Sequence, residues 1–342
     1  MRIKSYPQKL PLKEPFVLSH GTYHYREALI VELEEGEYKG YGEATAITYY
    51  GKTLNGFIEL LKEKAKAICD LELSSNSNTF PQIPVFFPDE PFLQSAVDCA
   101  CWDLWSRKRG KPLHQLIEQK SPPLSAFTLS GDAAHIDQQL GRGEWPIYKV
   151  KMGGNSDEAI LDVLTQYSSR CEIRVDANGG WNLEEALHFI PRLTSSGIKF
   201  IEQPLSSEQD HHMPRIKAET EAQLWADESA QQAEYFSNLV SGFHGVNLKL
   251  MKSGGISPVL EQIVHVQELG LKVGLGCMTE SSFGISALAQ IAGLADQLDM
   301  DGNMLLSKDP GSGAYIDKGR VILPDRAGLG CAWRTPPSQL HP

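Results

Sequence analysis

The sequence predicts a closed barrel of alternating parallel strands and helices, preceded by a smaller α+β domain. From residue 124 onward, short apolar runs that end in or near a polar residue recur about every 25 residues. Helical patterns fill the intervals, and this alternation is typical of a parallel sheet. Eight such runs match the strand number of a (β/α) barrel. An open doubly wound sheet is the alternative, but the chain has no GxGxxG or Walker turn.

The N-terminal part of the chain has a different pattern of apolar and polar residues. Residues 1–60 have the alternation and the turns of an antiparallel sheet. Residues 54–70 have helical periodicity, and residues 92–113 place apolar side chains at 93, 97, 101, 104 and 105 on one face of a helix. We therefore expect a separate α+β domain over residues 1–115.

Each predicted barrel strand ends at or near a residue whose side chain could take part in binding or catalysis. In chain order these residues are Thr128, Lys151, Asp176, Glu202, Asp227, Lys249, Cys277 and Asp299. Helices are predicted between them, for example over residues 182–197 and 257–270, with Asn182 and Ser257 as N-caps.

Composition limits the partners that the protein can have. The chain has 342 residues and a formal net charge of -11, which argues against nucleic acid or an anionic membrane surface. No apolar stretch reaches transmembrane length and the N-terminus has no signal-peptide pattern, so we expect no membrane partner and a cytoplasmic location. The six cysteines form no CxxC pair and fit reduced thiols.

Three carboxylates end three consecutive predicted strands. Asp176, Glu202 and Asp227 would meet at the C-terminal face of the barrel. Without a cation, their mutual repulsion would raise their pKa values and destabilise the fold. Hard oxygen ligands that leave positions open for water and substrate suit Mg²⁺. Any one of them alone could be a helix N-cap, but three at even spacing favour a metal site.

Lysines flank these carboxylates in strand order. Lys149 and Lys151 share one strand face, because strand side chains alternate, and Lys249 lies beyond the carboxylates. A lysine near Mg²⁺ and a second lysine is expected to have a lowered pKa and to act as a general base. Two such bases on opposite faces of one carbon can remove a proton from one side and return it from the other, which inverts the configuration of that carbon. A solvated edge strand is the alternative for Lys149 and Lys151.

Five motifs together resemble the enolase superfamily, in its muconate-lactonizing-enzyme subgroup. They are KVK (149–151), RVDAN (174–178), FIEQP (200–204), WADES (225–229) and NLKLMKSGG (247–255). The resemblance covers nearly the whole chain. It implies a TIM-like (β/α)7β barrel at residues 116–310, a capping domain at 1–115, and a C-terminal tail at 311–342 that packs back on the cap.

The resemblance also implies roles for the strand-end residues. Asp176, Glu202 and Asp227 would bind one Mg²⁺ per subunit. Lys151 and Lys249 would be the acid/base pair, and Lys149 would contact the substrate carboxylate and lower the pKa of Lys151.

The end of the last strand favours a dipeptide substrate. Asp299 and Asp301 share one strand face and look like the paired-aspartate motif with which dipeptide epimerases hold the α-ammonium group. Two carboxylates beside an anion-binding metal site suit a zwitterion, although they could instead cap a turn. Thr128 and Cys277 lie at strand ends where dipeptide epimerases contact substrate.

The resemblance also suggests which side chain is accepted. In the family, the first capping loop shapes that pocket, and members that act on Ala-Glu place an arginine there. Here residues 18–28 hold no arginine at the aligned position, beside His20, whereas Arg26 adjoins the next strand. Tyr23 and His24 complete a mixed aromatic specificity loop. We therefore expect epimerisation at the C-terminal residue of small or apolar dipeptides such as Ala-Ala.

Three alternatives remain at this stage. They are an L-Ala-D/L-Glu epimerase, an o-succinylbenzoate synthase that uses similar lysines and Mg²⁺ for syn dehydration, and a non-catalytic enolase-like binding protein. Asp299 and Asp301 argue against the second, and the full set of predicted catalytic groups argues against the third. We also expect residues 44–53 to close over the site and the protein to be a homo-oligomer, as related barrels often are.

Overall fold

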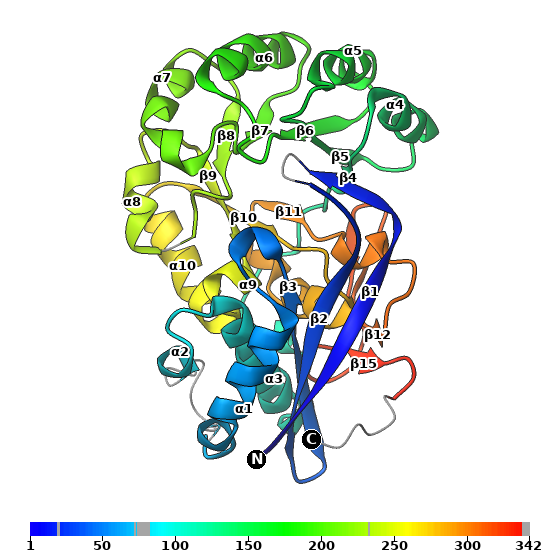
Figure 1. The fold of residues 1–342 in the computed structure, drawn as a ribbon, viewed down its shortest axis with the longest axis vertical. Coiled ribbons are helices and arrows are strands. Elements are labelled where there is room, and N and C mark those ends of the chain that lie inside the picture. The colour runs from blue at the N-terminus through cyan, green and yellow to red at the C-terminus, as the bar shows by residue number, and fades with distance from the viewer. Residues whose placement is uncertain (19–20, 72, 74–82, 232, 337–342) are drawn as a thin grey trace.

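The computed structural model describes residues 1–18, 21–71, 73, 83–231 and 233–336. These residues form a three-stranded antiparallel sheet beside an eight-stranded parallel sheet, together with helices that flank both (Figure 1). Two two-stranded sheets complete the described chain near its C-terminus. The predicted fold class, an N-terminal α+β unit and a (β/α)7β barrel, is confirmed.

The N-terminal unit combines the antiparallel sheet with three α-helices. Its strands are β1 (Arg2–Leu18), β2 (Gly21–Glu35) and β3 (Tyr38–Ala46), each paired with the next. The helical segments that follow are η1 (Thr48–Tyr50), α1 (Leu54–Cys69), α2 (Ile83–Phe86) and α3 (Pro91–Lys108).

The barrel strands pair in sequence order, so each strand lies next to the one that follows it in the chain. They are β4 (Phe127–Leu129), β5 (Ile147–Lys151), β6 (Glu172–Asp176), β7 (Phe200–Glu202), β8 (Gln223–Ala226), β9 (Gly245–Lys249), β10 (Lys272–Gly276) and β11 (Gln297–Asp299). A parallel bridge between Ser125 and Leu298 joins the two ends of the sheet. This closure excludes the open doubly wound alternative.

Helical connections cross the seven gaps between successive barrel strands. They are α4 (Ala133–Arg142), α5 (Asp157–Tyr167), α6 (Leu183–Ser195), η3 (Ser207–His212), α7 (Met213–Ala218), η4 (Ala233–Tyr235), α8 (Phe236–Leu239), α9 (Leu250–Ser253), α10 (Ile256–Glu268), α11 (Ser282–Ala289) and η5 (Ala292–Leu294). Asn182 is the predicted N-cap of α6, in a capping box with Glu185. The predicted N-cap Ser257 is wrong. Gly255 is the N-cap of α10, while Ser257 lies inside the helix and donates two hydrogen bonds to Asp98 of α3.

Helix α3 corrects the expectation of a one-sided amphipathic helix. Its residues from Phe92 to Ser106 are all buried, because β3 packs on one side of the helix and α9 on another. The approach to β3 is close: a Cβ atom on Gly42 would lie 2.0 Å from the carbonyl oxygen of Ala96. A helix buried on every side has no solvent face, so its polar residues bond inside the protein, as Asp103 does to the backbone N–H of Tyr41.

The C-terminal tail returns to the N-terminal unit. Its strands are β12 (Gly311–Ser312), β13 (Tyr315–Asp317), β14 (Arg320–Ile322) and β15 (Ala332–Trp333), and they follow η6 (Gly302–Leu305). The ring of Trp333 lies 5.3 Å from that of Tyr6 and 6.4 Å from that of Tyr41, centroid to centroid. These contacts agree with a tail that packs on the cap. The boundaries at 115/116 and 310/311 stay a proposal.

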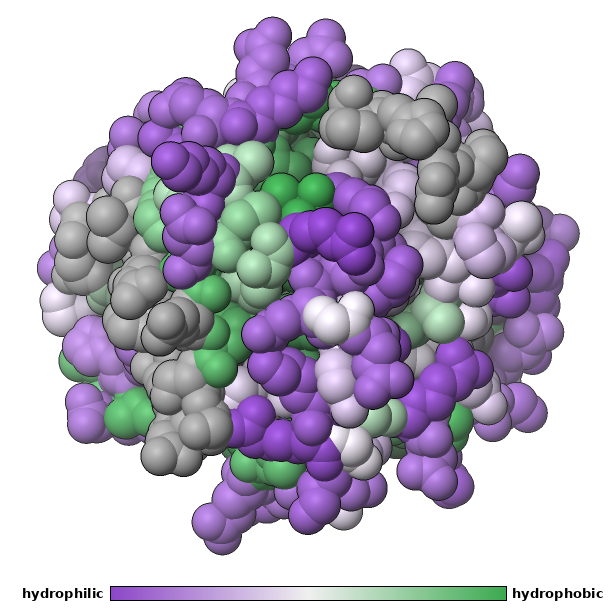
Figure 2. Space-filling view, turned by 90° about the horizontal axis from the view of Figure 1, so that it is seen from below, coloured by the Kyte–Doolittle hydropathy of each residue, from purple (hydrophilic) through white to green (hydrophobic). Residues whose placement is uncertain are grey.

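No helix in the part of the chain that the structure describes combines the length and the apolar character needed to cross a membrane. The face in Figure 2 is mainly hydrophilic, and hydrophobic atoms are visible between the polar side chains. The cytoplasmic location and the homo-oligomer stay predictions.

The contact between β3 and α3 leads to a stability prediction. Gly42→Val should lower the free energy of unfolding by at least about 1 kcal/mol, because the new side chain would overlap the backbone of Ala96. Gly154→Ala is the matched control, since a Cβ atom there meets nothing within 4 Å. Urea unfolding of both variants measures the difference, and equal stability would contradict the close packing.

Candidate active site

The strand register brings the predicted functional residues together at one end of the barrel. Lys151 of β5 pairs with Asp176 of β6, which pairs with Glu202 of β7. On the other side of the ring, Lys249 of β9 and Asp299 of β11 both pair with the last residue of β10. Because the strands are parallel and end at one level, all five side chains belong to the C-terminal face.

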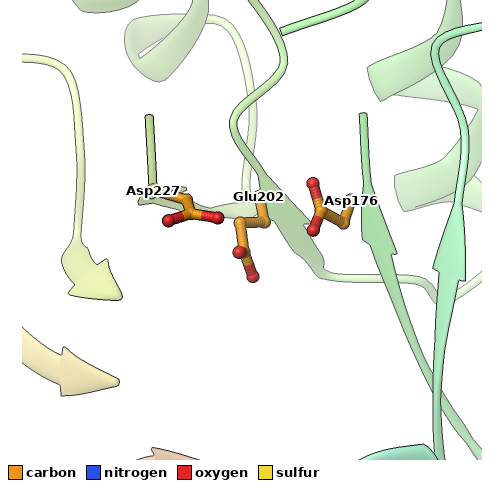
Figure 3. Close-up of side chains that lie close together, drawn as sticks. All are labelled: Asp176, Glu202 and Asp227. Atoms are coloured by element: carbon orange, nitrogen blue, oxygen red, sulfur yellow. The ribbon is translucent and has the colours of Figure 1, made fainter. Parts of the chain in front are cut away.

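The three predicted metal ligands form one cluster. Asp176 and Glu202 end β6 and β7, and Asp227 follows β8 directly; Figure 3 shows them side by side on neighbouring strands. One carboxylate oxygen from each lies within 4.8 Å of the others, and all three residues are buried. Buried carboxylates that converge in this way can hold a metal ion.

Lysines neutralise much of this negative charge. The ammonium group of Lys149 lies 3.0 Å from Asp176, 2.9 Å from Glu202 and 2.6 Å from Asp299. Lys151 donates to Asp176 Oδ2 at 2.6 Å. Lys149 therefore links the metal-ligand cluster to the aspartate pair at the end of β11.

Two further ammonium groups bond to Asp227. Lys249 donates to its Oδ2 atom at 2.8 Å, and Lys252 donates to its Oδ1 atom and to its main-chain oxygen. Both lysines are buried. Buried charges of this kind are tolerated because they are paired and hydrogen-bonded.

The pKa values of the cluster shift in both directions, and the lowered lysine pKa expected beside bound Mg²⁺ stays a prediction. Burial raises the pKa of Asp176, but the adjacent lysines outweigh it and lower the value to about 2, and lysines likewise lower the pKa of Asp227. Burial raises the pKa of Glu202 to about 7. Burial by itself lowers the pKa of Lys149 and Lys249, but the nearby carboxylates outweigh it and hold both well above the usual range.

A cavity of about 80 Å³ lies beside the lysines that pair with this cluster. Lys151 and Lys249 both line it, so the two predicted bases face one space. The predicted substrate contacts that line it are Thr128, Cys277, Asp299 and Asp301, and the other lining residues are Arg26, Ile47, Tyr49, Tyr50, Asn178, Glu228, Met278, Thr279, Gly302 and Leu305. Lys149 instead lines a smaller cavity inside the barrel.

The two predicted aspartates have different surroundings: Asp299 ends β11, whereas Asp301 lies beyond the strand as the N-cap of η6, so they do not share a strand face. Asp301 accepts hydrogen bonds from the backbone N–H of Thr128 at 2.6 Å and from its hydroxyl group at 3.1 Å. Burial and the charge of Asp299 raise the pKa of Asp301 to about 7. Asp299 is bonded to Lys149, and its pKa is lowered because the charges of the lysines outweigh burial. Asp299 is therefore already bonded to a lysine, whereas Asp301 beside it is a weaker acid than an ordinary aspartate.

Sequence reasoning missed several residues of this site. Asn178 lies in the left-handed region at φ 46°, and its side-chain N–H donates to Glu228 at 3.1 Å. Asn247 donates to Glu202 at 2.9 Å. These residues and Lys252 lie inside the RVDAN, WADES and NLKLMKSGG motifs, but strand spacing alone gave them no role. Tyr50 of η1 lines the cavity within the predicted closing segment.

The predicted specificity loop is largely a strand. Tyr23, His24 and Arg26 belong to β2, and His20 lies outside the described residues. His24 is exposed, whereas Arg26 is 6% exposed and lines the cavity. The Arg26 guanidinium carbon lies 3.6 Å from the Tyr23 ring centroid, and no carboxylate of the described residues pairs with it. An antiparallel hairpin thus carries Arg26 inward, which its position in the sequence did not indicate.

Comparisons with known proteins agree with this geometry. The family profile of the mandelate racemase / muconate lactonizing enzyme N-terminal domain matches residues 2–118, and that of the enolase C-terminal domain-like family matches residues 132–336. The chain belongs to the enolase superfamily, in its mandelate racemase / muconate lactonizing enzyme branch. The predicted family is confirmed.

Several relatives of this chain are named as epimerases. The L-Ala-D/L-amino acid epimerase of Flavobacterium johnsoniae is 33% identical over 94% of this chain and 96% of its own length. That of a Maribacter species is 34% identical over 96% and 98%. The dipeptide epimerase of Cytophaga hutchinsonii, solved with Mg and D-Ala-L-Val, is 26% identical with a TM-score of 0.90 and coverage of 98% and 96%.

A buried carboxylic acid beside the cavity makes stability depend on pH. Glu280 accepts a hydrogen bond from the backbone N–H of Met278 at 2.7 Å. Burial, together with the charge of Glu43, raises the pKa of Glu280 to about 8. The unfolded chain releases this proton at about pH 4.3. Between these two values only the folded protein holds the proton, so the free energy of unfolding falls as the pH rises.

Glu280→Gln should escape this decline, because an amide cannot ionise. The stability of the variant relative to the unmodified protein should therefore rise between about pH 5 and about pH 8, by up to about 1.4 kcal/mol per pH unit. Urea unfolding of both proteins across this range measures the difference and cancels the titration of other groups. A constant difference would contradict the raised pKa.

Proposed function

We propose that the protein is a Mg²⁺-dependent dipeptide epimerase that inverts the α-carbon of the C-terminal residue by a two-base proton transfer. One observation carries the proposal. The ammonium groups of Lys151 and Lys249 come from β5 and β9, on opposite sides of the carboxylate cluster, and both line the same narrow cavity. The names of the relatives support the reaction class, since epimerases and racemases are isomerases.

The carboxylate cluster fits Mg²⁺. Asp176, Glu202 and Asp227 offer hard oxygen ligands, which Mg²⁺ prefers, and the dipeptide epimerase of Cytophaga hutchinsonii was solved with Mg. When bound, Mg²⁺ would stabilise the negative charge that develops on the substrate carboxylate as the α-proton leaves. The three ligands would hold one ion per subunit.

The two lysines would move the protons. Lys249, whose ammonium group donates to Asp227 at 2.8 Å, would deliver a proton to the α-carbon. Lys151 would accept the proton on the opposite face. For substrate of the other configuration the two roles reverse, as inversion through a planar carbon requires.

The rest of the cavity would fix the dipeptide. Asp299 and Asp301 would bind its α-ammonium group, while the backbone N–H and hydroxyl groups of Thr128 hold Asp301 in place. Cys277, which lines the cavity, would lie against the substrate. Burial raises the pKa of the Cys277 thiol far above its usual range, which suits a wall residue rather than a nucleophile. An o-succinylbenzoate synthase has no use for such an aspartate pair.

The accepted side chain is small or apolar in this proposal, as in Ala-Ala. Ile47, Tyr49, Tyr50 and Leu305 form an apolar part of the cavity wall and would exclude water. One observation favours a second candidate, an L-Ala-D/L-Glu epimerase. Arg26 lines the same cavity and pairs with no carboxylate of the described residues, so an acidic side chain could supply its counter-ion.

Isotope exchange tests the two-base reaction. In D₂O with Mg²⁺, the unmodified protein should exchange the α-proton of L-Ala-L-Xaa dipeptides, and chelation of the metal should stop the exchange. Lys151→Ala and Lys249→Ala should each slow exchange from one configuration by about 10²- to 10⁴-fold. Lys217→Ala is the matched control, since among the described residues that lysine bonds to the main-chain oxygens of Val240 and Phe243 and to no carboxylate. Two fully active lysine variants would refute the scheme.

Substrate comparison tests the side-chain preference. We expect kcat/KM to be higher for L-Ala-L-Ala than for L-Ala-L-Glu, because Ile47, Tyr50 and Leu305 give part of the cavity an apolar wall. Steady-state polarimetry with both dipeptides, on the unmodified protein and on Arg26→Met, gives the comparison. The reverse order in the unmodified protein, lost by about tenfold or more in Arg26→Met, would select the Ala-Glu candidate.

A further inference from the structure

Asn247 is a buried amide beside the metal-ligand cluster. It lies on β9, two residues before Lys249, and is 4% exposed. Its side-chain N–H donates to Glu202 Oε1 at 2.9 Å. Asn247 does not line the substrate cavity, and its side chain reaches the cluster through this hydrogen bond to Glu202.

We propose that Asn247 is a positioning residue that turns the Glu202 carboxylate so that its second oxygen, Oε2, faces the bound cation. This inference rests on the proposed magnesium site. It assigns a role to a residue that lies outside the cavity lining and is not one of the three proposed ligands.

The hydrogen bonds to Glu202 distinguish its two oxygens. Asn247 and Lys149 both donate to Oε1, each at 2.9 Å. Among the described residues, no donor reaches Oε2. The other two ligands are held differently: Asp176 accepts from Asn178 on one oxygen and from Lys151 on the other. In Glu202, one oxygen is thus fixed by two donors, and the other is left for a ligand.

An amide suits this task better than another lysine would. Lys149 already brings one positive charge to Glu202 Oε1, and every further ammonium group near the cluster would repel a cation. The neutral Asn247 N–H orients the carboxylate without that repulsion. Glutamate has one more rotatable bond than aspartate, so its carboxylate needs a second contact to hold a single orientation.

The neighbouring strand leaves room for the amide. Residue 276 at the end of β10 is glycine, and a Cβ atom there would lie 2.6 Å from Asn247 Oδ1 and 2.8 Å from its Nδ2. Real Cβ atoms do not come so close, so a larger residue would displace the amide. Gly276 therefore gives a second way to disturb the same hydrogen bond without changing Asn247 itself.

Calorimetric titration of the full chain with Mg²⁺, without substrate, tests the inference. Asn247→Leu should weaken Mg²⁺ binding by about 10- to 100-fold, the usual cost of losing a residue that orients a metal ligand. Gln290→Leu is the matched control. Gln290 is a fully buried amide that bonds to the main chain of Leu329 and His114, and its loss should leave Mg²⁺ affinity unchanged.

Gly276→Ala is the second variant, and it keeps the test decisive if Asn247→Leu does not fold. It should weaken Mg²⁺ binding in the same direction, because the new methyl group displaces the Asn247 amide. Unchanged affinity in a folded Asn247→Leu or Gly276→Ala protein would overturn the inference and leave the proposed function standing. Failure of the unmodified protein to bind Mg²⁺ would overturn both.

Discussion

The structure depends on the concentration of buried charge at one end of a parallel barrel. Three carboxylates that converge within 4.8 Å would repel one another strongly in a low-dielectric interior. Four lysines balance them: Lys149, Lys151, Lys249 and Lys252 each contact at least one of the three. A cation on the same oxygens would compete with these ammonium groups. Lys151 and Lys249, the proposed bases, are therefore also among the groups that stabilise the proposed metal ligands.

The N-terminal unit contributes to the site through packing and through direct contact. Helix α3 is buried between β3 and α9, and α9 begins immediately after Lys249. At the end of α9, Gln94 of α3 donates to the main-chain oxygen of Gly254 at 3.2 Å. Meanwhile β2 and η1 bring Arg26 and Tyr50 to the cavity wall. The N-terminal unit thus packs against α9, the helix that follows Lys249, and also forms part of the cavity wall.

Much of the fold and the centre of the site could be predicted because both depend on periodic features. Parallel strands about 25 residues apart place their C-terminal ends at one level, so the residues at those ends form a ring whatever the detailed packing. This is why the barrel and the cluster of Asp176, Glu202 and Asp227 were predicted. The prediction of an amphipathic helix failed for α3, because burial on every side removes the polar face that the pattern assumes. The prediction of an N-cap failed for Ser257, because its hydrogen bonds go to Asp98, which is far away in the sequence.

The sequence by itself determined the chemistry that is available: which strands end in carboxylates, which in lysines, and in what order. Only the tertiary structure decided how those groups pair. It directed two donors to one oxygen of Glu202, joined Lys149 to Asp299 beneath the cavity, and turned Arg26 inward on β2. The physical reason is that strand order follows from local periodicity, whereas a hydrogen bond between distant residues depends on side-chain directions fixed only when the whole barrel closes.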